Sequence, residues 1–293
     1  MKLVMVHGRS QQGKDPVALE KTWTDALTYG LARGNIQLAP RTEPEFPYYG
    51  DKLTDLVDKI DDPLAPGVIT RGASPDGGDP AFRGELLLEL ATGLGLSEED
   101  AQREAPQEAL ERGPQNWGWV RAIARAIDRI PGINGEAIEL FTRDVYVYLT
   151  YDGVRQQIKQ IVAATIPEDE PFVLLAHSLG TIVSYDILCD RGVDPKCVRL
   201  ITVGCPLGIK AIQERLHDEP AVQSPPCVDN WFNAFDPRDV VALRPLDAAN
   251  FDVRPPVDND PNVVNFTDNR HGIAGYLADP LVAQKIAAAT HGA

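Results

Sequence analysis

The chain has 293 residues, of which 43% are hydrophobic, so it is long enough for one large α/β domain with an insertion or for two domains. Its formal net charge is −15, and an acidic surface repels nucleic acid and anionic lipid headgroups. We therefore expect neither nucleic acid nor a membrane as the main partner, whereas a neutral, hydrophobic ester is compatible with this charge.

Targeting and redox signals are weak. The apolar run in Met1–His7 is too short for a signal peptide, and no stretch of about 18 apolar residues could cross a membrane. The spacing of the four cysteines, Cys189, Cys197, Cys205 and Cys227, matches no metal-ligand pattern, although Cys189 and Cys197 could pair in an oxidising compartment. We expect a cytoplasmic protein with reduced thiols.

The amino-terminal part predicts a strand, a helix and a second strand. The apolar run Leu3–Val6 is typical of a buried parallel strand, and the loop of residues 7–13 follows it. Pro16 suits the first turn of a helix, which apolar residues at helical spacing extend to Gly34. Ile36–Ala39 is the candidate for the second strand.

The character of the sequence changes between residues 51 and 143. The segment Pro63–Arg83 is rich in Pro, Gly and Asp and is typical of a loop. Ser97 suits a helix N-cap because acidic residues fill the first turn after it. Helices are predicted over residues 85–94, 97–112 and 117–130. We interpret residues 51–143 as a mostly helical insertion rather than an independent domain.

Strands and helices alternate again from residue 151. A helix is predicted over residues 151–165 and another over 280–289, and the predicted strands are residues 171–175, 198–203, 231–235 and 263–266. Strands separated by helices imply a mostly parallel sheet, and ligands bind such sheets beyond the carboxyl ends of the strands. Four polar residues lie just past such ends: His7, Ser178, Asp239 and His271.

Ser178 is the candidate nucleophile. It lies in the pentapeptide Ala176-His177-Ser178-Leu179-Gly180, between an apolar strand and a helical stretch. A serine at a sharp strand-to-helix turn projects its hydroxyl beyond the sheet, where a base can reach it. Glycine is usual at the first position of this pattern, and Ala176 replaces it here.

A base and an acid are needed to activate a serine hydroxyl. His271 follows the last predicted strand and is the candidate base. Asp236 and Asp239 both follow the preceding strand and compete for the role of the acid. The order serine, acid, histidine favours Asp239, whereas Asp236 could form a turn with Pro237.

The order of these three residues resembles that of the α/β-hydrolase superfamily, and more narrowly of its lipase- and esterase-like members. The resemblance covers residues 2–33 and 151–289. His7-Gly8 resembles the oxyanion loop of these enzymes. Gly204-Cys205-Pro206-Leu207 resembles the turn after their next strand, and Arg238-Asp239-Val240-Val241 resembles the loop that carries their acid. The helical insertion would take the place of a cap or lid.

This resemblance implies a fold, a site and a reaction. The fold is a single α/β-hydrolase domain, residues 1–293, with a mostly parallel central sheet flanked by helices and a helical cap insertion. The N–H groups of Leu179 and Arg9 would form the oxyanion hole, with Ser10 as the nearest alternative donor to Arg9. The reaction is hydrolysis of a carboxylic ester through an acyl-enzyme, without a metal or organic cofactor.

The implied substrate is a small-molecule ester or acyl compound with an apolar acyl part. Thioesterases, amidases or peptidases and acyltransferases use the same triad, so these activities stay open. Outside enzymes, the alternative is a catalytically silent scaffold of the same fold that binds a partner. A complete set of serine, acid and histidine argues against that alternative.

The remaining polar residues near the strand ends are expected to be structural. His177 points to the opposite side of its strand from the nucleophile, so we expect it to be packed and hydrogen-bonded. His7 would shape its loop through hydrogen bonds, and Cys205 would be a small buried hydrophobe. The Arg9 side chain would bind an acidic group of the substrate or lie in solvent, and Asp144 is interpreted as a capping or surface acid.

Overall fold

The structure is a computed structural model that describes residues 1–60, 80–104, 117–130, 135–216 and 222–292. In this part of the chain, six parallel strands form one sheet in the order β2-β1-β3-β4-β5-β6. The strands are β1 (Lys2–Val6), β2 (Glu43–Glu45), β3 (Phe172–His177), β4 (Cys197–Val203), β5 (Trp231–Ala234) and β6 (Asp258–Asp260). The expected α/β class with a parallel sheet is confirmed.

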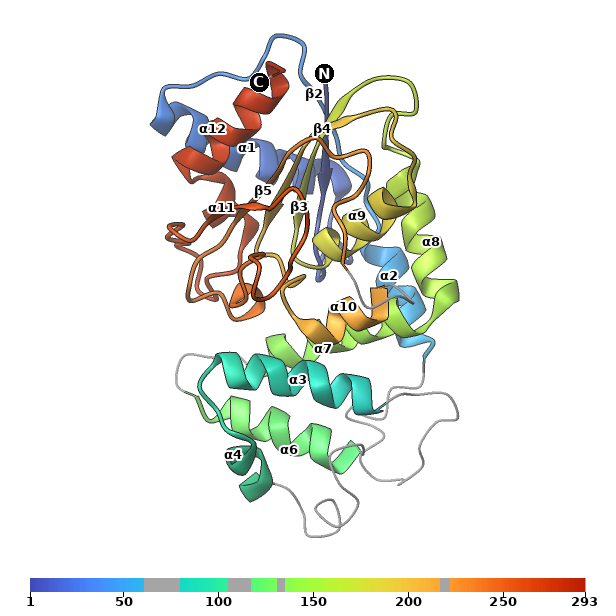
Figure 1. Ribbon diagram of the computed structural model, residues 1–293, viewed down its shortest axis with the longest axis vertical. Coiled ribbons are helices and arrows are strands. Elements are labelled where there is room, and N and C mark those ends of the chain that lie inside the picture. The colour runs from blue at the N-terminus through green and yellow to red at the C-terminus, as the bar shows by residue number, and fades with distance from the viewer. Residues whose placement is uncertain (61–79, 105–116, 131–134, 217–221, 293) are drawn as a thin grey trace.

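Helices cover both faces of this sheet (Figure 1). Leu3 and Met5 of β1 belong to an apolar cluster with α1 (Pro16–Gly34) and α12 (Pro280–Thr290), beside which lies α11 (Ile273–Leu277). Val4 and Val6 belong to the opposite cluster, which contains residues of α2 (Gly50–Asp58), α8 (Asp152–Ala163) and α9 (Leu179–Asp190). Successive side chains of a strand point to opposite faces, so an uninterrupted apolar strand supplies both clusters.

The strand order reverses between β1 and β3. The chain leaves β1 for β2 on one side, and then returns to pair β3 on the other side of β1. The crossovers after β1 and β3 therefore run in opposite directions, which opens a crevice beyond the carboxyl ends of these two strands. The loop after β1 and Ser178 after β3 both lie at this crevice.

Two predicted strands are wrong in position. Ile36–Ala39 is not a strand: α1 ends at Gly34, Asn35 follows with a left-handed φ of 52°, and Ile36 packs on the cluster around α1 and α12. The strand beside β1 is instead Glu43–Glu45. The apolar character of this segment indicated burial correctly, but Ile36 is partly buried from a loop rather than from a strand.

The last strand is also displaced. The segment Val263–Phe266 forms no strand, although its side chains alternate between buried and exposed positions. Val263 and Asn265 are buried, whereas Val264 and Phe266 are 69% and 65% exposed. The edge strand is Asp258–Asp260, whose polar sequence carries no strand signal.

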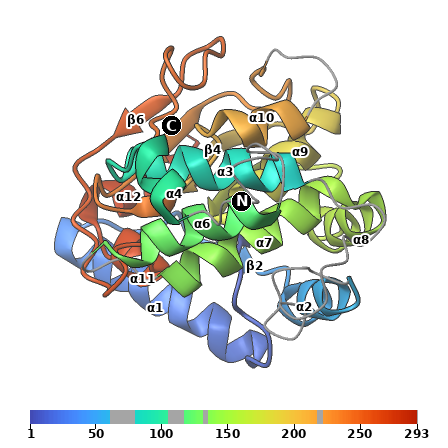
Figure 2. The same cartoon turned by 90° about the horizontal axis from the view of Figure 1, so that it is seen from below.

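Four helices lie beyond the carboxyl end of the sheet (Figures 1 and 2). They are α3 (Pro80–Gly93), α4 (Glu98–Glu104), α6 (Trp117–Asp128) and α7 (Gly135–Thr150). Ser97 caps α4 as predicted, because its Oγ accepts the N–H of Asp100 at 3.2 Å. Most of the predicted loop Pro63–Arg83 and residues 105–112 of the second predicted helix lie outside the described residues, while residues 80–83 begin α3.

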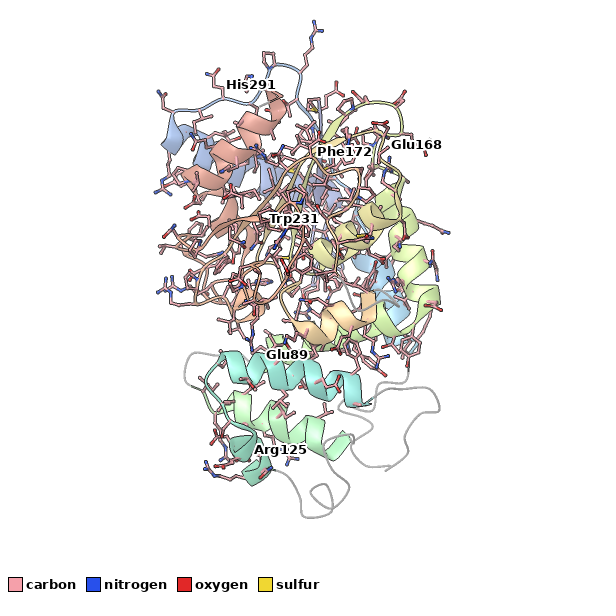
Figure 3. The ribbon with its side chains drawn as sticks, viewed as in Figure 1. Glu89, Arg125, Glu168, Phe172, Trp231 and His291 are labelled. Carbon is pink, nitrogen blue, oxygen red and sulfur yellow. The ribbon has the colours of Figure 1, made fainter. Side chains whose placement is uncertain are left out.

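The helix α7 was not predicted, and it runs across the expected insertion boundary at residue 143. It lies between α3 and the helices that pack on the sheet (Figure 1). The helix α3 also contacts α10 (Lys210–Leu216). Glu89 of α3 accepts the N–H groups of Lys210 and Ala211, at the start of α10, at 3.0 and 2.8 Å. Figure 3 shows Glu89 at this junction, so the helical layer is joined to the rest of the domain by side-chain capping as well as by packing.

A buried carboxylate joins three helices behind the nucleophile turn. Asp186 on α9 is 2% exposed and accepts Nε and Nη2 of Arg155 at 2.7 and 2.8 Å. It also accepts the Tyr148 hydroxyl at 2.8 Å and Lys159 Nζ at 3.0 Å. Because these partners come from α7 and α8, Asp186 fixes both helices to the helix that begins next to Ser178.

We predict that Asp186→Ala lowers the free energy of unfolding by about 3–5 kcal/mol, because two cations and a hydroxyl lose their buried partner. The measurement is urea denaturation at neutral pH. Asp190→Ala is the matched control: the Asp190 side chain is 70% exposed and, within the described ranges, pairs only with Lys159, so its loss should cost less than about 1 kcal/mol. Equal losses in the two variants would contradict the assigned role of Asp186.

Candidate active site

The turn at Ser178 is strained. The serine has φ 56° and ψ −128°, a conformation that non-glycine residues rarely adopt, and it lies between the last residue of β3 and the first of α9. Its N–H donates to Val203 O at 3.3 Å, and its carbonyl accepts the Thr181 hydroxyl at 2.7 Å. The side chain is 1% exposed and lines a cavity. Neighbouring backbone thus holds the hydroxyl beyond the end of the sheet.

Small residues at this turn are required by the neighbouring strand. A Cβ added at Gly180 would lie 2.4 Å from the carbonyl oxygen of His7, and one at Gly8 would lie 2.7 Å from Ser178 Cβ. The end of β1 therefore passes directly over the serine turn. Ala176 is completely buried in the cluster around α9, which accommodates its methyl group.

The structure brings His271 and Asp239 to the serine. His271 Nε2 lies 2.8 Å from Ser178 Oγ, and Nδ1 lies 2.7 Å from Asp239 Oδ2. When the serine hydroxyl donates to Nε2, the proton on Nδ1 donates to the carboxylate. The three side chains thus form one continuous chain of hydrogen bonds, although they are distant in sequence.

Further donors hold the carboxylate of Asp239. The Tyr276 hydroxyl donates to Oδ2 at 2.5 Å, and the N–H of Val241 donates to Oδ1 at 3.0 Å. Asp239 is fully buried. Burial and the neighbouring carboxylate raise the pKa of Tyr276 well above its usual value, so the phenol remains protonated and donates. Sequence reasoning missed Tyr276, because nothing in its neighbourhood indicates a partner 37 residues away.

Asp236 makes different contacts. Its Oδ1 accepts the N–H of Arg238 at 2.8 Å, and its Oδ2 accepts the N–H of Asn265 at 2.9 Å. Burial acts to raise the pKa of Asp236, but these two N–H donors and the guanidinium of Arg238 together outweigh it and hold the pKa below its usual value. Asp236 therefore orders the turn at Pro237 and the loop before His271, and it does not contact the imidazole.

Two amides beside the serine have no acceptor. Within the described part of the chain, the N–H groups of Arg9 and Leu179 donate to no protein atom. A Cβ added at Gly8 would lie 3.3 Å from Ser178 Oγ, so the loop that leads to Arg9 runs beside the hydroxyl. Leu179 begins a helix of 12 residues, whose amino-terminal amides favour negative charge. These amides are where the predicted oxyanion hole would form.

The side chain of Arg9 does not lie in solvent, and Asp144 is not the capping or surface acid that was expected. Arg9 Nε donates to Asp144 Oδ2 at 2.9 Å, and the two side chains are 16% and 9% exposed. Asp144 therefore lies inside the protein rather than at a helix end or on the surface, because α7 turns this residue toward the loop after β1. The ion pair fixes the position of Arg9 next to Ser178.

The two histidines expected to be structural are confirmed as such. The N–H of Tyr49 donates to His7 Nε2 at 3.1 Å, so Nδ1 carries the proton and donates to Gly8 O at 2.6 Å. Burial lowers the pKa of His7 to about 4. His177 Nε2 lies 2.7 Å from the carbonyl oxygen of His271, and burial lowers the pKa of His177 well below its usual value. Both rings are neutral, and both hold loops of the site.

A cavity of about 660 Å³ opens beside Ser178. Its apolar wall comes from α1, the loop of Asp239, α7 and the start of α11: Leu19, Trp23, Val240, Val241, Ala137, Ile138, Leu140, Phe141 and Ile273. The contribution of α7 was not foreseen, because its sequence resembles no known lid pattern. The cavity places apolar surface within reach of the serine hydroxyl.

Gly204 packs beneath the histidine and the acid. Its φ is +57°, and a Cβ there would lie 3.0 Å from His271 Cε1 and 3.2 Å from Asp239 Oδ2. The next residue, Cys205, is 1% exposed, and burial raises the pKa of its thiol to about 11. Cys205 is thus the buried, unreactive residue that was expected. All four cysteines are free, so Cys189 and Cys197 form no disulfide in this structure.

Comparison with known proteins identifies no relative: no protein-family model matches the chain, and neither a curated protein nor a solved structure is similar to it. Among the described residues, no group of three or more His, Cys, Asp and Glu side chains could hold a metal ion. None of the helices in the described ranges is both long and apolar enough to span a bilayer. The site must therefore be interpreted from its own geometry.

We predict that Gly204→Ala lowers the free energy of unfolding by about 1–2 kcal/mol, because alanine disfavours a positive φ. The added methyl also separates His271 from Asp239, which a crystal structure of the variant would show as a lengthened contact. Gly192→Ala is the control, since a Cβ at Gly192 meets no atom within 4 Å. An unchanged contact between His271 and Asp239 in Gly204→Ala would contradict this interpretation.

We predict that acid destabilises the fold partly through His7. Its folded pKa of about 4 lies below the unfolded value of 6.5, so the stabilisation is complete above pH 6.5 and disappears as the pH falls toward 4. The contribution is about 3 kcal/mol, because a tenfold change in a proton-binding constant corresponds to about 1.4 kcal/mol. Urea denaturation between pH 7 and pH 4 measures it. His7→Asn should lose less stability over this interval than the wild type, and identical losses would refute the assignment.

Proposed function

We propose that this chain is a serine hydrolase of the α/β-hydrolase type that cleaves carboxylic esters through an acyl-enzyme. The observation that carries the proposal is the chain of hydrogen bonds from Ser178 Oγ through His271 to Asp239, at 2.8 and 2.7 Å. It lies at the carboxyl end of a parallel sheet, beside two N–H groups with no acceptor among the described residues. Nucleophile, base, acid and oxyanion donors thus surround one point.

In the first half of the reaction, His271 Nε2 removes the proton of Ser178 while Oγ bonds to the ester carbonyl carbon. The carbonyl oxygen becomes an oxyanion, which the N–H groups of Leu179 and Arg9 stabilise, each donor being worth about 3 kcal/mol. Asp239 keeps the imidazole in the required tautomer and stabilises its positive charge. The bond to the leaving alkoxide then breaks, and His271 gives its proton to that oxygen.

In the second half, water replaces the alcohol. His271 removes a proton from the water molecule as its oxygen bonds to the acyl carbon. The bond between the acyl carbon and Ser178 Oγ then breaks, and the serine recovers its proton from His271. The products are a carboxylic acid and an alcohol, and the side chains return to their starting protonation states. No metal or organic cofactor takes part.

The fold and the cavity support the proposal. The strained turn at Ser178 and the sequence order serine, aspartate, histidine resemble those of α/β-hydrolases, and the helices beyond the carboxyl end of the sheet would act as a cap. The apolar wall of the cavity suits the acyl part of an ester. Thioesters, amides and acyl transfer to another acceptor require the same triad, so substrate trials must include them.

A series of p-nitrophenyl esters from acetate to laurate tests the proposal, with matched thioesters and amides. We expect the wild type to hydrolyse the esters, and Ser178→Ala and His271→Ala to lower kcat by about 10⁴-fold or more. Ser184→Ala is the control, because the Ser184 hydroxyl is buried in the helix that follows Ser178 and has no hydrogen-bond partner among the described residues. Full activity in Ser178→Ala would overturn the proposal.

The acid is tested separately. Asp239→Asn should lower kcat by about 10⁴-fold, because the amide imposes the wrong imidazole tautomer. Asp236→Asn should act mainly on the free energy of unfolding, since Asp236 accepts only N–H groups of its own loops and of Arg238. The reverse pattern would assign the role of the acid to Asp236.

A further inference from the structure

The charge of the cavity differs from that of the whole chain. The chain has a formal net charge of −15, yet the cavity beside Ser178 is lined by more cationic than acidic side chains. The cations are Arg9, Lys14, Arg238 and Arg270, and the acids are Asp239 and Asp268. Asp239 is already bound by His271 and Tyr276, so one acid faces four cations.

Two of these cations have no acidic partner among the residues that the structure describes. Lys14 Nζ donates to the amide oxygen of Gln11 at 2.9 Å, and Arg270 Nη1 donates to the carbonyl oxygen of Asn265 at 2.8 Å. Both acceptors are neutral. Because no carboxylate of the described residues neutralises Lys14 or Arg270, both keep their charge available to an anion in the cavity.

The other two cations are only partly neutralised. Arg9 uses Nε alone to bind Asp144, and within the described ranges its two Nη groups have no acceptor. Arg238 binds Asp236 at 3.3 Å but is 57% exposed. A planar guanidinium that has free Nη groups can bind a carboxylate or phosphate with two hydrogen bonds.

The cations and the apolar wall occupy different parts of the cavity. Lys14 and Arg238 are exposed and Arg270 is half-buried, and we call these three the cationic rim. Leu19, Trp23, Ile138, Phe141 and Val241 are buried. A ligand that fills this space has an apolar body in the interior and a negative charge at the solvent side.

We propose that the substrate carries an anionic group apart from its scissile ester, a carboxylate or a phosphate, which the cationic rim and the Nη groups of Arg9 bind. This inference rests on the proposed ester hydrolysis and names the class of its substrate. It explains why an acidic protein keeps unpaired cations in this cavity. It also assigns a role to Lys14 that the triad does not require.

Matched pairs of p-nitrophenyl esters test the inference. On one arm, the acyl chain ends in a carboxylate, a phosphate or a neutral carboxamide; on the other, the charged or neutral group is on the nitrophenyl ring. We expect kcat/KM for an anionic ester to exceed that of its carboxamide partner by about 10-fold at low salt, and the preference to decrease as salt screens the charges. The arm that shows the preference locates the anion on the acyl or the alcohol side.

Lys14→Gln is the sharpest variant, because Lys14 lies on an exposed loop and its ammonium group hydrogen-bonds only Gln11 among the described residues, whereas Arg270 adjoins the proposed base. It should lower the anionic preference by about 3-fold or more. Lys21→Gln is the matched control, because this substitution changes the net charge by the same amount. Lys21 is 70% exposed on α1 and pairs with Asp25 outside the cavity. The inference is overturned if both variants lose the preference equally, or if the wild type has none.

Binding to the Ser178→Ala protein separates this inference from the proposed function. Calorimetry with the same intact esters should give tighter binding of the anionic member of each pair. Tighter anion binding without turnover by the wild type would support the anion site and reject ester hydrolysis. Turnover of neutral and anionic esters at equal kcat/KM, with equal binding, would reject the anion site and leave ester hydrolysis intact.

Discussion

The geometry of the site depends on the close approach of two strand ends. The end of β1 crosses the turn after β3 so closely that no side chain fits at Gly8 or Gly180. Ser178 has a positive φ at this crossing, and the loop that leads to Arg9 runs beside its hydroxyl. One backbone crossing therefore determines where the hydroxyl points and where negative charge would be stabilised, which is the preorganisation that acyl transfer requires.

His271 and Asp239, the proposed base and acid, are held by residues outside the proposed triad. His177 binds the backbone carbonyl of His271, and Tyr276 donates to the same oxygen of Asp239 that accepts the hydrogen bond from His271 Nδ1. Burial keeps His177 neutral, so it adds no charge that would oppose protonation of His271. The backbone of His271 and the carboxylate that binds its Nδ1 are thus both fixed, which orients the imidazole toward Ser178 Oγ.

The sequence predicts those parts of the site whose signals are local. The turn around Ser178 combines an apolar strand, small residues and a helix within one segment, and His271 and Asp239 follow from the order of such triads. The strands Glu43–Glu45 and Asp258–Asp260 could not be predicted, because they are short and polar and owe their conformation to the strands they pair with. The partners of Arg9 and Asp239 were missed for a similar reason: α7 and α11 bring them from far along the chain.

A crystal structure of the chain treated with an alkyl fluorophosphonate tests the central claim most directly. The account predicts phosphorus bonded to Ser178 Oγ, with the phosphoryl oxygen accepting the N–H groups of Leu179 and Arg9 and the alkyl group against the wall formed by α7. An unmodified Ser178, or an adduct whose phosphoryl oxygen points away from both amides, would contradict it.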